Sequence, residues 1–463
     1  MSYARFSPTD FRYAVKELIP YLSEEAYVKY KARVEGALAL QLSRAGLCDK
    51  AIAAEISKAC EEVSASEVYA EEARIKHDIR ALANVIRRKV SKRAKPFVHL
   101  TATSYDIVDT ANALRFKDAI QKVVVPDLTR LEFALIEMST IYADTVQVGR
   151  THGQHAEPIT FGFFLACYVS RLGGRILKIK EAANNLSGKF AGAVGVYGPL
   201  SLLVPRPEAF EAQLLESLGL PASEISTQIV QSEAMTDLMH SIVSTFGVLA
   251  NFARDIRHLQ RSEIDEVSED FGKSQVGSST MPQKRNPISF ENLESMWKKF
   301  MPQMVTVYMD QISEHQRDLT NSSSQRYLPE LIVAFDYSVR RLTRTIWDDS
   351  ANRPNLGVDQ QHMKRNLELS ADQMAAEPLY VLLAIAGHPD AHEYVREAVQ
   401  RTIETGASFR DFVKSDPKLK EYLKVVDKRK LKLVENPALY TGLAASKSKS
   451  VARKWKELLT ASG

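Results

Sequence analysis

The sequence predicts an all-α protein organised around a bundle of long helices. Apolar side chains recur every three or four positions over four long runs, which is the spacing of one face of a helix. Strand signals are sparse, and neither βαβ alternation nor a GxGxxG or P-loop motif occurs. With 20 Gly and 18 Pro among 463 residues, the composition also argues against loop-rich β architectures.

Each predicted helix follows from one of these apolar runs. The runs cover residues 120–138, 161–179, 235–259 and 331–346. In the third run, the steps between apolar residues average close to the spacing of a helix-bundle seam. Pro126 lies inside the first run, where it is expected either to start a helix or to kink one. Helices of this length need neighbours of similar length, which favours an elongated bundle.

Two polar stretches divide the predicted helices into three parts. The first spans residues 101–110, and the second, DDSANRPNLG at 348–357, is dense in turn-forming residues. The expected domains are a mostly helical N-terminal domain (1–111), a central long-helix bundle (112–355) and a C-terminal helical domain (356–463).

The composition favours a cytoplasmic protein without a nucleic-acid or membrane partner. The net charge is only +4, and the basic clusters at 87–95 and 428–432 lack interleaved aromatic residues, so we interpret them as solvated helix faces. No stretch approaches the length of a membrane-spanning apolar segment, and the opening MSYARFSPTDF lacks the pattern of a signal peptide. Cys48, Cys60 and Cys167 show no CxxC spacing and are expected to be free thiols in a reducing compartment.

The densest group of loop-forming and polar residues is GKSQVGSSTMPQKRNP, at 272–287. A loop of 16 residues between long helices is unusual, and it favours a functional role over a plain surface loop. Its two glycines allow the backbone to approach a ligand, and Lys284, Arg285 and Asn286 offer donors for carboxylates. We therefore expect a mobile catalytic loop over residues 269–287.

Within this loop, GSSTMPQKRNP resembles the GSSxMPxKxNP motif of the fumarase/aspartase superfamily. Further blocks resemble that superfamily in the same order, most of them in the form found in its adenylosuccinate lyase family. They are SPTDFRY (7–13), KHD (76–78), HLTATSYDIVDTA (99–111), GRTHGQHAEPITFG (149–162) and RDLTNSSSQRYLPE (317–330). Blocks spread over almost the whole chain make chance agreement improbable.

The resemblance implies a three-domain fold whose central helices form the 20-helix core of a homotetramer. It also implies a β-elimination in purine biosynthesis, which releases fumarate from adenylosuccinate to leave AMP, and from the succinylated aminoimidazole carboxamide ribotide. We expect no metal and no organic cofactor, because no His, Cys, Asp or Glu group has ligand spacing and the elimination needs no redox step.

The implied reaction needs a base, an acid, and groups that stabilise a dianionic aci-carboxylate. The family pattern places the base at Ser279 and the acid at His152. It pairs Glu291 with His152, where a carboxylate would raise the proton affinity of the imidazole. Lys284 would stabilise the Ser279 alkoxide and the aci-carboxylate. The alternatives are Ser278 for the base and His155 for the acid.

The family pattern also identifies residues that contact the substrate, and arginine forks among them suit phosphate oxygens. The matched positions are Arg12, Tyr13, Ser322 and Arg326 for the phosphate, Thr103 and Ser104 for the succinyl carboxylates, and His77, Asp78, His99, Gln228, Asn286 and Arg317 for other parts of the substrate.

Three positions depart from the adenylosuccinate lyase pattern. Thr280 and Gln283 stand where Ala and His are common, and a Gln there is similar to argininosuccinate lyases. Ser232 stands where many bacterial relatives carry Arg. Argininosuccinate lyase and carboxymuconate cycloisomerase therefore stay open as alternatives, although the matched phosphate set argues against both. A catalytically silent structural protein on the same scaffold is a third alternative, and the matched catalytic residues argue against it.

Overall fold

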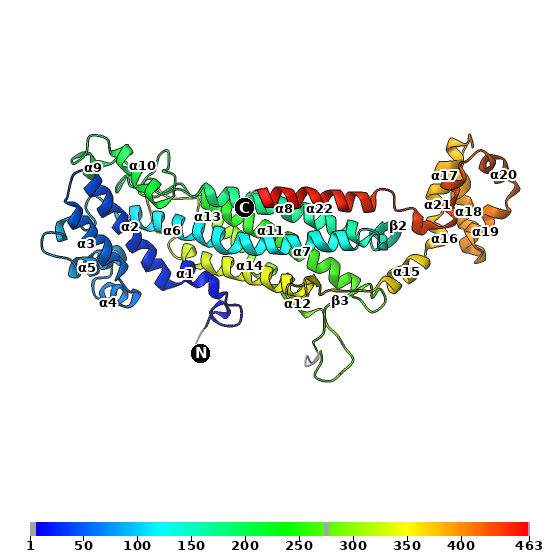
Figure 1. Cartoon of the computed structure of the whole chain (residues 1–463), viewed down its shortest axis with the longest axis horizontal. Helices are drawn as coiled ribbons and strands as arrows, with labels where there is room; N and C mark the ends of the chain where they lie inside the picture. Colours follow the sequence, from blue (N-terminus) through cyan, green and yellow to red (C-terminus); the bar gives the residue numbers. More distant parts are fainter. Residues whose placement is uncertain (1–5, 273–276, 462–463) are drawn as a thin grey trace. The chain divides into compact units, whose positions relative to one another are not determined.

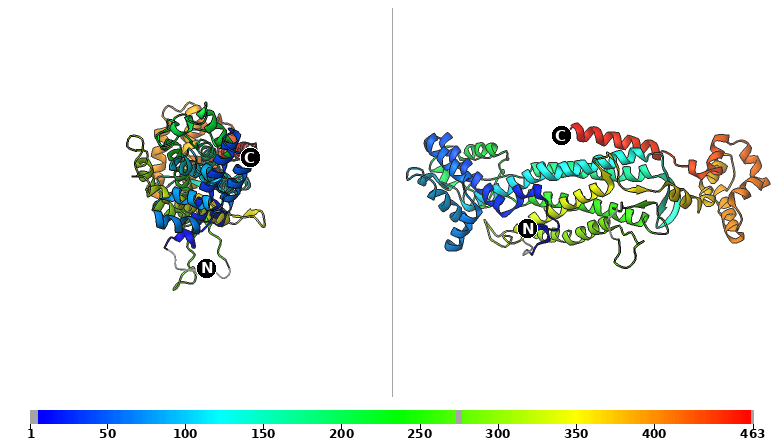
Figure 2. Two further views of the ribbon diagram at one scale, coloured as in Figure 1. Left: turned by 90° about the vertical axis from the view of Figure 1, so that its left-hand side faces the viewer. Right: turned by 60° about the horizontal axis from the view of Figure 1, so that its bottom comes forward.

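The structure is a computed structural model that describes residues 6–272 and 277–461. Residues 273–276 of the predicted catalytic loop lie outside the described residues. The all-α prediction is confirmed, because helices make up most of the described chain and its strands form only short two-stranded sheets (Figures 1 and 2). Over these same residues, no helix has both the length and the apolar character needed to span a membrane.

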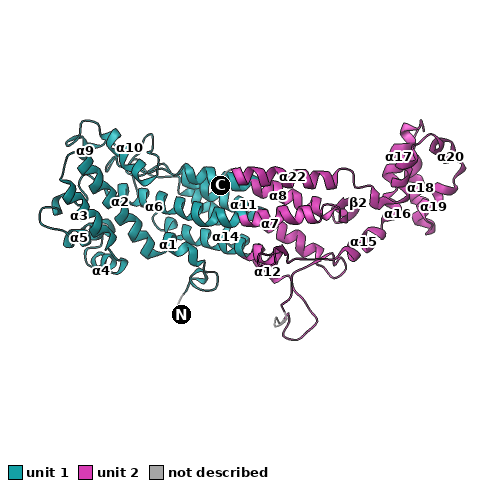
Figure 3. Ribbon diagram, viewed as in Figure 1, with its two compact units in different colours: residues 1–129, 174–249, 295–340 teal, residues 130–173, 250–294, 341–463 magenta. Residues whose placement is uncertain are grey.

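The chain divides into two compact units, each assembled from three segments (Figure 3). Unit 1 comprises residues 1–129, 174–249 and 295–340, and unit 2 comprises residues 130–173, 250–294 and 341–463. The predicted three-part division at residues 111 and 355 stays a prediction. The helices that contribute residues to both units are α7 (Val125–Ile141), α8 (Phe161–Asn184), α11 (Glu233–Leu259), α12 (Ile288–Phe300) and α14 (Ser324–Ile346).

The other described elements of unit 1 are helical. Helices α2 to α5 surround an apolar core to which Val28, Ile56, Leu82 and Ile86 contribute buried side chains. The bounds are η1 (Pro8–Asp10), η2 (Lys16–Leu18), α1 (Ile19–Leu22), α2 (Glu24–Arg44), α3 (Lys50–Glu61), α4 (Ala65–Ile75), α5 (Asp78–Arg88), η3 (Lys95–Phe97), α6 (Ser104–Ala119), η4 (Ile120–Val124), α9 (Gly198–Ser201), α10 (Pro207–Leu218) and α13 (Gln303–Met309).

Unit 2 holds the strands and a cluster of short helices. The strands pair antiparallel as β1 with β2, β3 with β6 and β4 with β5, and helices α17 to α21 enclose a core that includes Leu383, Phe409 and Leu419. The bounds are β1 (Val146–Thr151), β2 (Gln154–Thr160), β3 (Val267–Ser268), β4 (Trp347–Asp348), β5 (Arg353–Pro354), β6 (Gly357–Val358), α15 (Gln360–Glu368), α16 (Ala371–Met374), α17 (Ala376–Ile385), α18 (Ala391–Thr405), α19 (Phe409–Ser415), α20 (Pro417–Lys424), α21 (Lys428–Glu435), η5 (Pro437–Leu439) and α22 (Ala444–Ala461).

All four apolar runs lie in helices, and two of these helices contain a proline. Pro126 is the second residue of α7, two residues after the end of η4, a π-helical turn through which α6 continues into α7. Pro329 lies inside α14, where it removes one donor from the helical ladder. No helix starts at Pro126: the helical stretch runs unbroken through it, and the irregularity beside the proline is the π-helical turn.

Candidate functional site

A cavity of about 470 Å³ within unit 1 gathers several predicted substrate-binding residues. They come from the junction of α4 and α5, the start of α6, the segment before α11 and the start of α14. The volume lies in the range of small-molecule binding sites. The predicted residues that line the cavity are His77, Asp78, Ser104, Gln228, Ser322 and Arg326.

The N-terminus of α6 presents Ser104 to this cavity. Thr103 is the N-cap residue, and its backbone N–H donates to Asp106 Oδ2 at 2.8 Å. Asp106 is buried, and its other carboxylate oxygen accepts from the buried Lys189 Nζ and from the backbone N–H of Gly192. Because unpaired N–H groups and the helix dipole favour anions at a helix N-terminus, this end of the cavity suits a substrate carboxylate.

His77 and Asp78 begin helix α5 at the edge of the cavity. His77 is the N-cap residue, and its Nδ1 accepts from the backbone N–H of Arg80 at 3.3 Å, so the neutral imidazole carries its proton on Nε2. Asp78 Oδ2 lies 3.8 Å from Nζ of Lys31, a lysine that is only 3% exposed. Burial lowers the pKa of Lys31, and the charge of Asp78 opposes that shift. Lys31 therefore positions Asp78.

Arg317 anchors the segment before α14 to helix α6. Its Nη2 donates to Tyr105 Oη, and its guanidinium carbon lies 4.2 Å from the centroid of the same ring. Its Nη1 donates to Asn321 Oδ1 at 3.1 Å. The neighbouring Gln316 accepts a backbone hydrogen bond from Gln228. Tyr105 and Gln228 line the cavity whereas Arg317 does not, so in this chain Arg317 supports the wall of the cavity from behind.

Arg12 and Tyr13 do not line the cavity in this chain. Arg12 is exposed, and the ring of Tyr13 packs against Tyr337 with 5.1 Å between the centroids. Of the predicted phosphate set, the structure therefore brings only Ser322 and Arg326 into the cavity. Thr103 and His99 also lie outside the lining, although Thr103 caps the helix that carries Ser104.

His99 forms an ion pair with a buried carboxylate. Its Nδ1 lies 2.6 Å from Oε1 of Glu35, which is 2% exposed. Burial disfavours the imidazolium, but the charge and hydrogen bond of Glu35 outweigh it and raise the pKa of His99 above its usual value. His99 also adopts a left-handed backbone conformation, with φ of 62°, in the turn that leads to α6. The pair thus ties the approach to α6 onto α2.

Replacing His99 by Gln is expected to make the protein less stable at acid pH by about 1.5–3 kcal/mol, the value of a hydrogen bond to a charged group. The folded chain binds the His99 proton more tightly than the unfolded chain. The contribution of the His99 ion pair to the free energy of unfolding is therefore fully present below about pH 6.5, and it disappears as the pH rises through the raised pKa of His99. Urea unfolding from pH 5.5 to 9 measures this difference, with the exposed His258→Gln as control. A His99 difference that does not vary with pH would contradict the ion pair.

In unit 2, His152 lies at the tip of the β1–β2 hairpin. Thr151 pairs with Gln154, which leaves His152 and Gly153 as a two-residue loop. Both loop residues have positive φ, 53° and 77°, as a type I′ turn requires. The hairpin therefore exposes the imidazole of His152 at a fixed point of the unit 2 surface.

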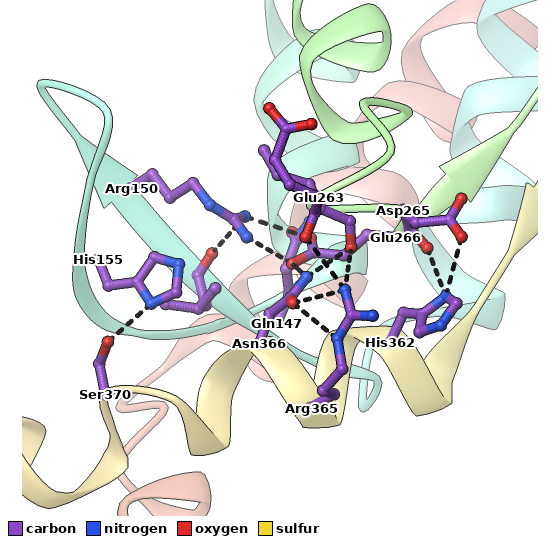
Figure 4. A network of polar contacts seen from close by, with 12 residues as sticks. Gln147, Arg150, His155, Glu263, Asp265, Glu266, His362, Arg365, Asn366 and Ser370 are labelled. Carbon is purple, nitrogen blue, oxygen red and sulfur yellow. Dashed lines mark hydrogen bonds and ion pairs between the residues drawn. The ribbon is translucent and has the colours of Figure 1, made fainter.

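A buried carboxylate, Glu266, fixes this hairpin (Figure 4). Glu266 is fully buried and accepts hydrogen bonds from Gln147 Nε2 at 2.7 Å and from Arg150 Nη2 at 2.6 Å, both on β1. Asn366 Nδ2, on α15, donates to it at 2.9 Å. A buried charge is stable only when it is fully paired, so these donors hold β1 in place. Because Glu266 directly precedes β3, the same carboxylate connects the His152 hairpin to the segment that leads into the loop with the GSSTMPQKRNP motif (277–287), here called the signature loop.

The two adjacent serines of the signature loop have different surroundings. Ser278 Oγ accepts hydrogen bonds from the backbone N–H groups of Thr280 at 3.3 Å and Met281 at 3.0 Å. Ser279 is exposed, and its hydroxyl makes no hydrogen bond with the described residues. Ser278 therefore shapes the turn, whereas Ser279 has its hydroxyl available for a substrate.

The described part of the loop closes on itself through Gly277. Asn286 Nδ2 donates to the carbonyl oxygen of Gly277 at 3.0 Å. A Cβ at Gly277 would lie only 2.0 Å from the carbonyl oxygen of Lys284, so no other residue fits at this crossing. Lys284 itself is exposed, and the side-chain amide of Asn286 uses one of its donors for the loop backbone.

Glu291 and His155 have partners other than His152. Glu291, in the first turn of α12, lies 3.8 Å from Nη2 of Arg257 and is half exposed. His155 Nδ1 lies 2.8 Å from Ser370 Oγ, and burial together with the charge of Arg150 lowers the pKa of His155. This hydrogen bond ties His155 to the segment between α15 and α16, and its assignment as the alternative acid stays a prediction. The pairing of Glu291 with His152 stays a prediction.

Several residues that shape the site were missed by sequence reasoning. They are charged residues at buried helical or loop positions, where burial depends on distant parts of the chain. Only Asp106, inside the block HLTATSYDIVDTA, had a local signal. The missed residues are Lys31, Glu35, Asp106, Lys189 and Glu266. Among residues 6–272 and 277–461, no group of three or more His, Cys, Asp or Glu side chains is placed to hold a metal ion.

Comparisons with known proteins identify the family of the chain. Residues 12–301 match a family described as lyase. The chain is 34% identical over 459 residues to an adenylosuccinate lyase of Pyrococcus abyssi, covering 97% of this chain and 98% of the relative. It is 32% identical over 458 residues to an adenylosuccinate lyase of Archaeoglobus fulgidus, covering 98% and 99%.

Solved structures share the fold. A 3-carboxy-cis,cis-muconate lactonizing enzyme from Pseudomonas putida superposes with a TM-score of 0.82 at 25% identity, covering 97% of this chain and 99% of that chain. A fumarate lyase from Mesorhizobium sp. BNC1 also gives 0.82, at 21% identity, covering 98% and 99%. The fold and the signature loop together define a lyase of the fumarase/aspartase superfamily. Within that superfamily, the chain belongs to the adenylosuccinate lyase family.

Proposed function

We propose that the protein releases fumarate from adenylosuccinate, leaving AMP, and from the succinylated aminoimidazole carboxamide ribotide of purine biosynthesis. The observation that carries this proposal is a cavity with groups suited to both ends of a succinylated nucleotide. Ser104, at a helix N-terminus, suits the succinyl carboxylates, and Ser322 with Arg326 suits the phosphate. His77 and Asp78 line the same cavity and offer polar contacts for the purine base.

The proposed chemistry assigns one role to each group outside the cavity. Ser279, as an alkoxide, takes the proton from the succinyl carbon next to a carboxylate, and Lys284 stabilises the aci-carboxylate that forms. The carbon–nitrogen bond then breaks, the electron pair of the aci-carboxylate forms the double bond of fumarate, and His152 protonates the departing nitrogen. Asn286 holds the loop, and Glu291 raises the basicity of His152.

The assembly and location are part of the same proposal. We propose a homotetramer whose central helices form a 20-helix core and whose sites combine residues from different chains. Support comes from the exposure of Ser279, Lys284 and His152 on one chain, where a partner surface can complete the site. We also propose a cytoplasmic location, which the three free cysteines support.

Absorbance assays test the function, with adenylosuccinate, argininosuccinate and 3-carboxy-cis,cis-muconate supplied side by side to the same purified protein. Release of fumarate is followed for the first two substrates, and loss of the conjugated diene is followed for the muconate, because its cyclisation to a lactone releases no fumarate. Fumarate release from adenylosuccinate alone supports the proposal. Turnover of argininosuccinate or of the muconate alone would assign the protein to another superfamily activity, and no turnover of any of them would favour a structural protein.

Replacing Arg326 by Ala is expected to raise the Michaelis constant for adenylosuccinate by roughly 10- to 100-fold, because charge-assisted bonds to the phosphate are lost. The turnover rate at saturation should change much less, since the phosphate lies away from the reacting bond. Steady-state kinetics measure both constants, and Arg344→Ala, at the last turn of α14, serves as the control. An unchanged Michaelis constant would remove Arg326 from the phosphate set.

A further inference from the structure

One buried cation at the cavity has no role in the site described so far. Arg115, on α6, is 4% exposed and lines the same cavity as Ser104 and Arg326. Its neighbours in the lining are Asn112, one turn earlier on α6, and Tyr27, on α2. A guanidinium buried beside a binding cavity is costly unless acceptors satisfy its donors, so its partners decide its role.

The partners of Arg115 hold the group in place but leave donors unused. Its Nε donates to Asn112 Oδ1 at 2.9 Å. Its guanidinium carbon lies 4.2 Å from the centroid of the Tyr27 ring and 4.8 Å from that of Phe116. Within the described residues it has no carboxylate within 4 Å, and burial lowers its pKa although Glu24 attracts it from further away. The two terminal nitrogens are thus free to bind an anion in the cavity.

Arg115 packs on Tyr27, which lines this cavity together with Arg326. Tyr27 and Arg326 line both this cavity and a neighbouring one of about 650 Å³. Along α6, Arg115 follows Ser104 by about 16 Å at the helical rise, and its side chain reaches back by about one turn. Helix α6 thus carries Ser104, which suits a carboxylate, at its start and the Arg115 guanidinium, which suits a phosphate, near its end. This spacing fits the two anionic ends of a succinylated nucleotide.

We propose that Arg115 is a further substrate-binding residue, whose guanidinium binds the nucleotide phosphate together with Arg326. Asn112 and Tyr27 act as positioning residues that fix the plane of the fork. Glu24 and Glu72 also line the cavity, and as acceptors they suit ribose hydroxyls rather than the phosphate. The inference rests on the proposed function, because it takes the substrate to be a nucleotide monophosphate.

Binding of AMP and of adenosine tests the inference without turnover. Arg115→Met keeps an unbranched side chain against Tyr27 but removes the fork. We expect this variant to bind AMP roughly 10- to 100-fold more weakly than the unmodified protein, measured by calorimetry, and to bind adenosine within about twofold. The matched control is Arg33→Met, because Arg33 pairs with Asp118 and packs on Tyr30 but does not line the cavity. It should alter neither affinity.

Equal weakening of AMP binding and adenosine binding in Arg115→Met would assign Arg115 a structural role and overturn the inference. So would unchanged AMP affinity, or an unmodified protein that binds AMP no better than adenosine. If Arg115→Met does not fold, Arg115→Lys decides, with an expected loss of about threefold to tenfold for AMP alone; full AMP affinity in this variant overturns the inference. Failure of the unmodified protein to release fumarate from adenylosuccinate would reject the proposed function. The affinities for AMP and adenosine would still test whether Arg115 binds the phosphate.

Discussion

Replacing Ser279 by Ala is expected to lower the turnover rate by about a thousandfold or more, with substrate affinity changed by less than about tenfold. The hydroxyl of Ser279 is exposed and bonds to none of the described residues, so its loss removes no support from the loop. A base acts on the substrate only as the proton leaves, which is why its removal affects turnover far more than binding. Single-turnover kinetics and equilibrium binding of adenylosuccinate measure the two quantities separately.

The neighbouring serine provides the matched control. Ser278→Ala removes the acceptor for the N–H groups of Thr280 and Met281, so it should loosen the turn while leaving the base in place. We expect a loss of turnover well below that of Ser279→Ala. If Ser279→Ala keeps more than a tenth of the turnover while Ser278→Ala loses it, the base is Ser278.

Mixing two inactive variants is expected to restore about a quarter of the sites. His152→Ala and Ser279→Ala chains are unfolded together in equal amounts and reassembled. If each site takes its histidine and its serine from different chains, half of the histidines and half of the serines are intact, and they combine at random. Fumarate release per active site, with hybrids counted by native mass spectrometry, measures the restored fraction.

A second mixture controls for restored folding. Ser279 and Lys284 lie on the same loop of one chain, so a site built from one loop can never contain both groups intact when Ser279→Ala and Lys284→Ala chains are mixed. This mixture should stay inactive. Hybrids of the first mixture that are as inactive as their parents would show that His152 and Ser279 act within one chain, or that one of them is not catalytic.

The long helices could be predicted because their burial repeats along the sequence. Helix α11 covers Glu233–Leu259, and the apolar run that predicts it starts two residues later. The β1–β2 hairpin could not be predicted in the same way. Its turn uses His152 and Gly153 where Asn-Gly is the usual signal, and strands this short carry little alternation. The hairpin instead depends on Glu266, more than a hundred residues further along the chain.

The site shows the same division between local and distant causes. Motif positions such as Ser104, His77 and Arg326 were found because their neighbours in sequence identify them, and the structure gathers them at one cavity. Lys31 and Arg115 could not be found from the sequence, because a charged residue in a helix is expected to be exposed to solvent unless its neighbours in space are known. Their burial comes from partners on other helices, Asp78 for the first and Tyr27 for the second.

The π-helical turn η4 has a consequence for how this region can change in evolution. It joins α6 to α7 without a break, and it takes about one residue more than an α turn to complete the same revolution. Deleting one codon within 120–124 would therefore restore plain α geometry while the face that carries Ser104 and Arg115 keeps its direction relative to Leu128. Leu128 is buried, so the core contacts of α7 and the substrate-facing side of α6 would both persist. A single-residue gap at this point in a distant relative is therefore compatible with the same binding face.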